Sequence, residues 1–156
     1  LSSSSQLLRL RKDIRNRVTY KGPGTIEDGV RSRVEIEFEV DNYENARILF
    51  ENLGYEVIMV YEKFRTTYAL DDAEIVLDEM PYGNFIEIEA SDPEVIHSLA
   101  DKLNLDWEAR IFDSYTVLFD FLKWTRGFQF RDLSFENFTS LEISPQDLGL
   151  RYADTP

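Results

Sequence analysis

The sequence contains no cysteine and only one histidine, His97. The absence of cysteine excludes disulfide bonds, thiolate metal sites and cysteine nucleophiles. A single histidine removes most histidine-based catalysis, and no Ser-His-Asp arrangement is expected. We expect His97 to be an exposed helix residue with no catalytic part. A glycine-rich phosphate loop of the Walker or dinucleotide type is also missing from the sequence.

Positive charge and long apolar runs are scarce as well. Seventeen Lys and Arg residues against thirty Asp and Glu residues give a net charge of −13 at pH 7. This charge disfavours nucleic acid and anionic membrane surfaces as partners, but it is compatible with a small phosphorylated molecule bound by a local basic cluster or divalent cations. No apolar run approaches membrane-spanning length, and no secretory leader is visible. We therefore expect a cytoplasmic monomer or homodimer.

Enough apolar residues are present to build a core. They make up 43% of the 156 residues, and aromatic residues make up 13%. A chain of this length and composition is expected to fold as one domain over residues 1–156.

Local patterns predict an α+β fold. Alternation of apolar and polar residues predicts strands over 6–13, 16–21, 32–40, 57–69, 74–78 and 84–90. Gly22-Pro23-Gly24 predicts a loop over 22–29. Helices are predicted over 43–53, 91–103 (opening on a Ser91-x-x-Glu94 capping box) and 115–125. The last thirty residues are expected to be a packing tail with little regular structure, and Trp107 and Trp124 to pack helices.

Charged residues on the predicted strands are sorted by sign along one face. Glu35 and Glu37 alternate with apolar residues, as do Glu87 and Glu89, while Lys63 shares a face with Arg65. Residues i and i+2 of a strand lie roughly 6.6 Å apart on the same side, so each pair sets like charges side by side. Such rows favour a sheet that curls into a barrel with a charged lumen, whose apolar outer face is covered by the helices 43–53 and 93–103.

Two sets of residues are candidates for chemistry. Carboxylates on neighbouring strands can hold Mg²⁺ or Mn²⁺, which prefer hard oxygen ligands. Arginine and lysine can bind phosphate oxygens. The acidic set is Glu35, Glu37, Asp78, Glu87 and Glu89, and the basic set is Arg9, Arg11, Lys21, Arg33, Lys63 and Arg65. On spacing alone, an exposed acidic strand face and salt bridges between the two sets remain alternatives.

Six short motifs in a fixed order resemble one family. They are Leu8-Arg-Leu-Arg11, Thr19-Tyr-Lys-Gly-Pro23, Arg33-Val-Glu-Ile-Glu37, Tyr61-Glu-Lys-Phe-Arg-Thr-Thr-Tyr68, Leu77-Asp78 and Gly83-Asn-Phe-Ile-Glu-Ile-Glu89. This combination resembles the CYTH superfamily of class IV adenylate cyclases and thiamine triphosphatases, also called triphosphate tunnel metalloenzymes. The resemblance covers residues 7–105 and leaves a C-terminal helix and tail over 106–156.

The resemblance implies an antiparallel eight-stranded β-barrel, or tunnel, with helices packed outside. It implies a metal-dependent enzyme acting on ATP, inorganic triphosphate or thiamine triphosphate, with the basic set as phosphate contacts and the acidic set as ligands of Mg²⁺ or Mn²⁺. Hydrolysis and cyclisation of ATP both stay open, and no catalytic residue is singled out. A catalytically inactive phosphate- or polyphosphate-binding module is the alternative. The family's first Glu-x-Glu-x-Lys strand has no match before Leu7, so we expect that strand upstream of Leu1.

Overall fold

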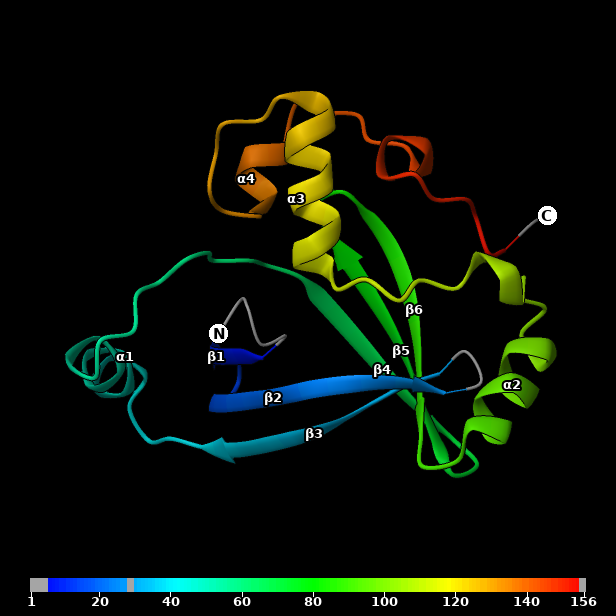
Figure 1. Ribbon diagram of the computed structural model, residues 1–156, viewed down its shortest axis with the longest axis horizontal. Helices are drawn as coiled ribbons and strands as arrows, with labels where there is room; N and C mark the ends of the chain where they lie inside the picture. The colour runs from blue at the N-terminus through cyan, green and yellow to red at the C-terminus, as the bar shows by residue number, and fades with distance from the viewer. Residues whose placement is uncertain (1–5, 28–29, 155–156) are drawn as a thin grey trace. The chain divides into compact units, whose positions relative to one another are not determined.

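The computed structural model describes residues 6–27 and 30–154. The chain divides into two compact units, residues 1–57 and residues 58–156, which we call the N-terminal and C-terminal units. Each unit contains one three-stranded antiparallel sheet with helices, which confirms the α+β class (Figure 1). Within the described residues, no helix is both long and apolar enough to cross a membrane.

The sheet of the N-terminal unit has the strand order β1-β2-β3, with β1 at Leu7–Lys12, β2 at Asn16–Glu27 and β3 at Val30–Glu39. The prediction of a loop from residue 22 was wrong, because β2 continues through Gly22-Pro23-Gly24. The pairing of β2 with β3 shifts register between Lys21 and Gly24. Proline lacks the N–H that a regular ladder needs, and an irregularity of this type accommodates it. Positions 28 and 29 of the predicted loop lie outside the described residues.

Helix α1, Tyr43–Asn52, follows β3. The Asn42 side chain caps its first turn by accepting a hydrogen bond from the Asn45 N–H at 2.9 Å, and Gly54 follows its end with a φ of +88°. We expected this helix to cover the apolar face of the sheet. Within the N-terminal unit it contacts β1, while Ile36 and Phe38 on β3 are each 55% exposed. The predicted cover of β3 by α1 was therefore wrong, because α1 lies over the opposite edge strand of that sheet.

The C-terminal unit has the strand order β4-β5-β6, with β4 at Phe64–Leu70, β5 at Ala73–Met80 and β6 at Gly83–Ala90. Helix α2, Pro93–Lys102, packs on β6 and buries Leu99 and Ala100. The helix boundary differs from the predicted capping box, since Asp92 and not Ser91 is the N-cap, accepting from the Glu94 N–H at 2.9 Å.

Residues 57–63, predicted as part of a long strand, precede β4. Their only described pairing is one parallel bridge between Tyr61 and Leu133. The partner lies in the C-terminal segment 106–156. This segment contains helix α3 at Tyr115–Arg126, and after it the tail with the single turn α4 at Phe135–Phe138; 3-10 turns lie at Trp107–Ala109 and Pro145–Leu148. Sequence periodicity cannot reveal such a pairing, because the partner lies more than seventy residues away.

The main core of the C-terminal unit lies between α3, the tail and the β5–β6 turn. Its buried members are Met80, Tyr82, Leu118, Phe119, Leu122, Leu133, Phe138 and Leu148. The prediction of a packing tail was thus correct in that the tail packs, although it forms more regular turns than expected. Trp124 was expected to pack a helix, but it is 80% exposed.

Candidate functional site

One face of the N-terminal sheet carries charges in columns. Because strand pairing places Arg9 opposite Thr19 and Thr19 opposite Glu37, these three side chains form one row across β1, β2 and β3. The flanking rows are Leu7, Lys21 and Glu35 on one side and Arg11, Arg17 and Glu39 on the other. The face therefore changes from basic on β1 to acidic on β3, and five predicted site residues lie on it: Arg9, Arg11, Lys21, Glu35 and Glu37.

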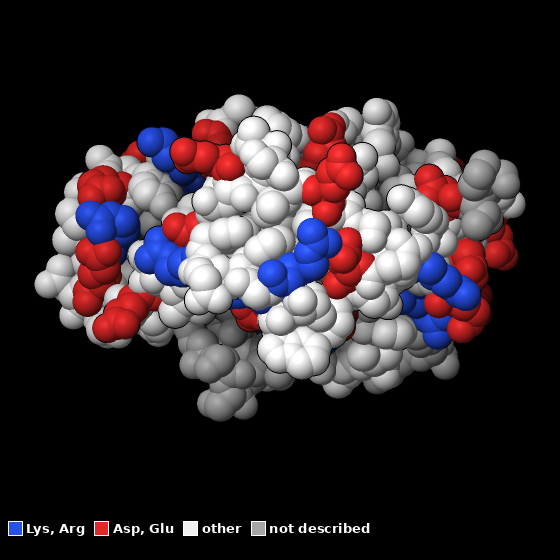
Figure 2. Space-filling view, turned by 90° about the horizontal axis from the view of Figure 1, so that it is seen from above, with Lys and Arg blue, Asp and Glu red and all other residues white. Residues whose placement is uncertain are grey.

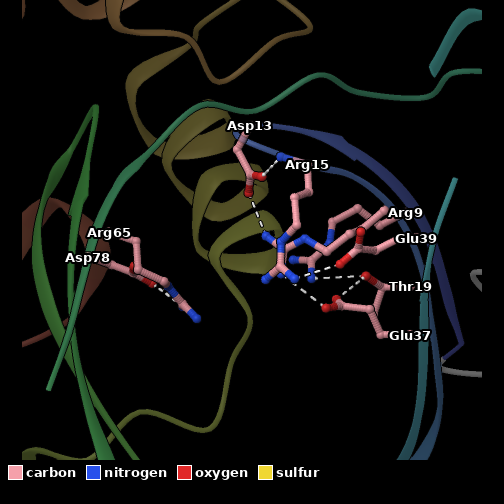
Figure 3. Close-up of polar contacts among 9 residues, drawn as sticks. Arg9, Asp13, Arg15, Thr19, Glu37, Glu39, Arg65 and Asp78 are labelled. Atoms are coloured by element: carbon pink, nitrogen blue, oxygen red, sulfur yellow. Dashed lines mark hydrogen bonds and ion pairs between the residues drawn. The ribbon is translucent and has the colours of Figure 1, made fainter. Parts of the chain in front are cut away.

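The middle row is tied together by hydrogen bonds around Glu37 (Figure 3). The fully buried Thr19 donates its hydroxyl to Glu37 Oε2 at 2.8 Å, and Arg17 Nη1 lies 3.0 Å from Glu37 Oε1. Arg9 Nη2 donates to Thr19 Oγ1 at 3.5 Å. Partial burial opposes ionisation of Glu37, yet the hydrogen bonds from Thr19 and Arg17 lower its pKa. Glu37 is accordingly held as a carboxylate.

Ion pairs also occur on both sides of the middle row. Lys21 Nζ lies 2.8 Å from Glu35 Oε2, and Arg15 Nη1 lies 2.5 Å from Glu39 Oε1. Arg33 is exposed near the other end of β3, opposite Gly24. The sheet therefore groups Arg33 less closely with the other basic residues than the sequence suggested.

Sequence reasoning missed Arg17, which contacts both Glu37 and Asp13. Burial opposes its charge, but the contacts with Asp13 and Glu37 raise the pKa of Arg17. A signal was available, because Arg17 precedes Thr19 and Lys21 with the period of two that defines one strand face. Thr19 was missed for a different reason: a neutral hydroxyl does not stand out in a search for charges.

A second cluster lies in the C-terminal unit around the buried Asp78. Arg65 binds this carboxylate with two nitrogens, Nε to Oδ1 at 2.6 Å and Nη2 to Oδ2 at 2.5 Å. Lys63 Nζ donates to Oδ2 at 2.6 Å, and the Tyr115 hydroxyl donates to the same oxygen at 3.0 Å. The side chain of Asp78 is 0% exposed, against 10% for Lys63 and 29% for Arg65.

Burial and ion pairing oppose each other in this cluster, and the outcome differs between its members. Burial raises the pKa of a carboxylic acid, but hydrogen bonds from Arg65 and Lys63 hold the pKa of Asp78 below its usual value. Burial lowers the pKa of Lys63, with Arg65 adding to that effect and Asp78 opposing it. For Arg65, burial is outweighed by the contacts with Asp78 and Glu87, which raise its pKa. The buried Tyr115 has a raised pKa and stays neutral.

Glu87 and Glu89 extend the cluster along β6. Arg65 Nη2 also lies 2.7 Å from Glu87 Oε2, so this guanidinium joins two carboxylates. Glu89 is exposed one row farther along the strand, where it faces Glu74 across the ladder. The structure thus brings Lys63, Arg65, Asp78 and Glu87 into direct contact and places Glu89 at the edge of this group.

The predicted metal ligands can be tested by the chemistry of their donors. All five are carboxylates, the hard oxygen donors that Mg²⁺ and Mn²⁺ prefer. Among the described residues no three Asp, Glu or His side chains converge on one point. Mg²⁺ typically takes one or two protein carboxylates and completes its shell with water and phosphate oxygens. By donor type alone, the five carboxylates fit such an ion.

Cations and carboxylates also lie side by side on the visible surface. On the face drawn in Figure 2, Lys and Arg atoms are next to Asp and Glu atoms. The surface set includes the contacts of Arg47 with Glu44 and Glu51 on α1 and of Arg126 with Asp147 at 2.8 Å. Surface pairs of this type contribute little to stability, so pairing alone does not identify a functional site. The burial of Thr19 and Asp78 distinguishes the two clusters above.

The single histidine takes part in packing. His97 is half-buried and stacks on Trp107, with ring centroids 3.8 Å apart. The Arg110 guanidinium lies over two aromatic rings, 5.1 Å from the Trp107 centroid and 5.4 Å from the Phe112 centroid. The expectation of an exposed His97 was wrong, because the turn at Trp107–Ala109 brings an indole ring against it. The prediction that Trp107 packs is correct.

Comparisons with known proteins agree with these motifs. The family model of the CYTH domain matches residues 1–114. A curated protein of Methanocaldococcus jannaschii named "Putative adenylate cyclase MJ0240" is 34% identical over 90 residues, which are 56% of this chain and 51% of that protein. The chain thus spans about half the length of the curated relative it matches.

A solved structure gives the same result for the fold. The PH1012 protein from Pyrococcus horikoshii OT3 is 32% identical and has a TM-score of 0.63, over 72% of this chain and 73% of that one. The family model alone covers well over half of the chain, and its matched residues include both clusters except Tyr115. The chain therefore belongs to the CYTH domain family.

Proposed function

We propose that this chain belongs to a metal-dependent enzyme that acts on a triphosphate substrate. The observation that carries the proposal is the pair of Lys63 and Arg65, which are held side by side on the buried carboxylate of Asp78. Two fixed cations next to each other suit the closely spaced charges of a polyphosphate, since arginine binds phosphate oxygens bidentately and lysine adds a point charge. Family membership and the adenylate cyclase name of one relative support a nucleotide or another triphosphate as the substrate.

In this proposal the basic residues of both sheets bind the phosphates. Arg9, Arg11 and Lys21 form one group on the N-terminal sheet, and Lys63 and Arg65 form the other. Their work is to bind, align and neutralise the anion, which is most of what catalysis of phosphoryl or nucleotidyl transfer requires. Arg33 is a further phosphate candidate. The eight-stranded tunnel that the family resemblance implies is part of this proposal.

The carboxylates that would hold Mg²⁺ or Mn²⁺ are Glu35, Glu37, Glu87 and Glu89, with Asp78 as the remaining family position. When bound, the ion would neutralise phosphate charge and polarise the phosphorus centre. Glu35 and Glu87 keep part of their side chains exposed, 42% and 34%, so each can exchange its cationic partner for another ligand. A phosphate group that takes over Lys21 would release Glu35, and one that takes over Arg65 would release Glu87.

Two reactions fit such a site. If water attacks the terminal phosphorus, the products are inorganic phosphate and the corresponding diphosphate. If the ribose 3′-hydroxyl of ATP attacks the α-phosphorus, the products are cyclic AMP and pyrophosphate. We favour triphosphate hydrolysis as the reaction. The full-length protein should be incubated with Mg²⁺ or Mn²⁺ and with ATP, inorganic triphosphate or thiamine triphosphate, and its products identified. Cyclic AMP with pyrophosphate would replace hydrolysis by cyclisation.

The catalytically inactive phosphate- or polyphosphate-binding module is the alternative. Metal-dependent triphosphate binding without any turnover would select it. Arg65→Ala should weaken binding of triphosphate at least tenfold, because a charged hydrogen bond contributes about 1.5–3 kcal/mol. Arg47→Ala is the matched control: it also removes an arginine with two carboxylate partners, but from helix α1. Equal effects of the two substitutions would contradict the assignment of Arg65.

A further inference from the structure

Tyr115 lies in a part of the chain to which no function is assigned. It is the first residue of α3 and stands one position beyond the residues that the family model matches. Its ring packs edge-on against Phe85, with centroids 5.2 Å apart, and Phe85 is the strand partner of Asp78. This packing directs the hydroxyl toward Asp78 Oδ2, to which it donates at 3.0 Å.

The hydrogen bonds of Asp78 leave little room for another ligand. A carboxylate offers about four lone-pair sites. Oδ2 accepts from Lys63, Arg65 and Tyr115, and Oδ1 accepts from the Arg65 Nε. Four donors already surround this carboxylate and its side chain is 0% exposed, so a metal ion could reach it only if neighbouring side chains moved.

We propose that Tyr115 and Asp78 are positioning residues that hold Lys63 and Arg65 as one preassembled anion-binding pair, and that Asp78 does not ligate the metal. The inference rests on the proposed function insofar as it takes the two cations as phosphate contacts. Tyr115 supplies a neutral donor where a third cation would otherwise be needed, so the carboxylate is fully hydrogen-bonded while the cluster gains no further charge. The face of its ring also lies against Lys63, whose Nζ is 5.3 Å from the ring centroid.

The same C-terminal segment fixes the backbone that leads to Lys63. The Val60 N–H donates to Asp132 Oδ1 at 2.9 Å, and the Leu133 N–H donates to the Val60 carbonyl at 2.9 Å. Glu62 is held at both ends, since its N–H donates to the Leu133 carbonyl and its carboxylate accepts from the Phe135 N–H. The tail thus fixes the chain just before Lys63, while Tyr115 fixes the group that Lys63 binds.

The first experiment needs no substrate. The pKa of Lys63 is measured from its ¹³Cε chemical shift in the full-length protein and in two variants. Asp78→Asn should lower the pKa of Lys63, because the carboxylate that supports its charge is removed while the positive charge of Arg65 remains nearby. Tyr115→Phe should raise it, because Oδ2 then no longer shares its charge with the hydroxyl. An unchanged pKa of Lys63 in Tyr115→Phe would overturn the proposal.

The second experiment measures binding of inorganic triphosphate by calorimetry in EDTA, so that no metal contributes. Tyr115→Phe should weaken binding about 3- to 10-fold, the effect of one lost hydrogen bond. Phe138→Leu is the control: it thins the same core and lowers stability but removes no hydrogen bond to Asp78, so it should leave the affinity unchanged. Equal loss of affinity in both variants would make the role of Tyr115 merely structural.

The two experiments separate this inference from the proposed function. If the unaltered protein fails to bind triphosphate, the proposed function fails, and the opposite shifts of the Lys63 pKa still decide whether Tyr115 and Asp78 position the cations. For the role of Asp78, metal binding to Asp78→Asn is followed by Mn²⁺ relaxation enhancement. An unchanged Mn²⁺ affinity is expected, and a loss of tenfold or more would return Asp78 to the metal ligands.

Discussion

Substitution of Asp78 by asparagine should destabilise the C-terminal unit strongly. Asparagine keeps the shape of the side chain but removes the charge that Lys63 and Arg65 share. Removing one partner of a buried ion pair costs about 3–5 kcal/mol, because the other charge is left without compensation. Since Arg65 keeps 29% of its side chain exposed and Lys63 keeps 10%, both cations retain some access to water. We therefore expect a somewhat smaller loss of about 2–4 kcal/mol.

The loss is measured by urea unfolding, followed by near-ultraviolet circular dichroism of the aromatic core. With a slope of about 2 kcal/mol per molar urea, the transition midpoint should fall by about 1–2 M. Glu79→Ala is the matched control, because Glu79 follows Asp78 on β5 but is exposed, so that its removal should change the free energy of unfolding by less than about 0.5 kcal/mol. A loss below about 1 kcal/mol for Asp78→Asn would refute the view that this cluster is a buried, interdependent unit.

The effect should also depend on pH with a defined sign. The pKa of Asp78 lies below its ordinary value of 3.8 in the folded protein. Its contribution to stability is therefore complete above the unfolded-state pKa and is lost as the pH falls through the lower, folded-state pKa. The difference in free energy of unfolding between the unaltered protein and Asp78→Asn should stay constant from about pH 7 to pH 5 and shrink below about pH 4.

Three further predictions concern catalysis and packing. The double substitution Glu87→Gln and Glu89→Gln should abolish metal-dependent turnover while circular dichroism stays unchanged; retained turnover would contradict their assignment. Phe119→Ala should lower the free energy of unfolding by about 3–5 kcal/mol in a denaturant titration, because this side chain of α3 is fully buried in the core. Gly127→Ala should cost about 1 kcal/mol by thermal unfolding, because the helix ends there with a φ of +70° and no neighbour lies close enough to add a steric penalty.

The strands and the charged faces were largely accessible to sequence reasoning, because a period of two is a local property. The alternation around Glu35 and Glu37 predicts β3, and that around Glu87 and Glu89 predicts β6, within two residues of the observed ends. The break at Pro23 was overestimated, since a shift of register can absorb a proline without ending the strand. The pairing of strands into two sheets depends on distant residues, so no local pattern could establish it.

The centre of the second cluster was harder to predict. Lys63 and Arg65 were identified by their charge, but the depth of burial of Asp78 was not, because a lone carboxylate in a strand is usually exposed. Tyr115 was missed because an aromatic residue at the start of a helix is usually a packing residue. Its contact with Asp78 also joins residues that are 37 positions apart in the sequence. Contacts of this kind come from tertiary structure and leave no periodic signal in the sequence.

The columns of the N-terminal sheet have a consequence for orientation. A basic column on β1 and an acidic column on β3 form an electric dipole that runs across the strands, with Arg9 at its positive end and Glu37 at its negative end. A ligand with an anionic part and a cationic part is turned by such a field before any hydrogen bond forms, because only one orientation matches both ends. A ligand bound on this face would therefore be selected by its direction as well as its charge, and exchanging Arg9 and Glu37 would weaken that preference while keeping the net charge the same.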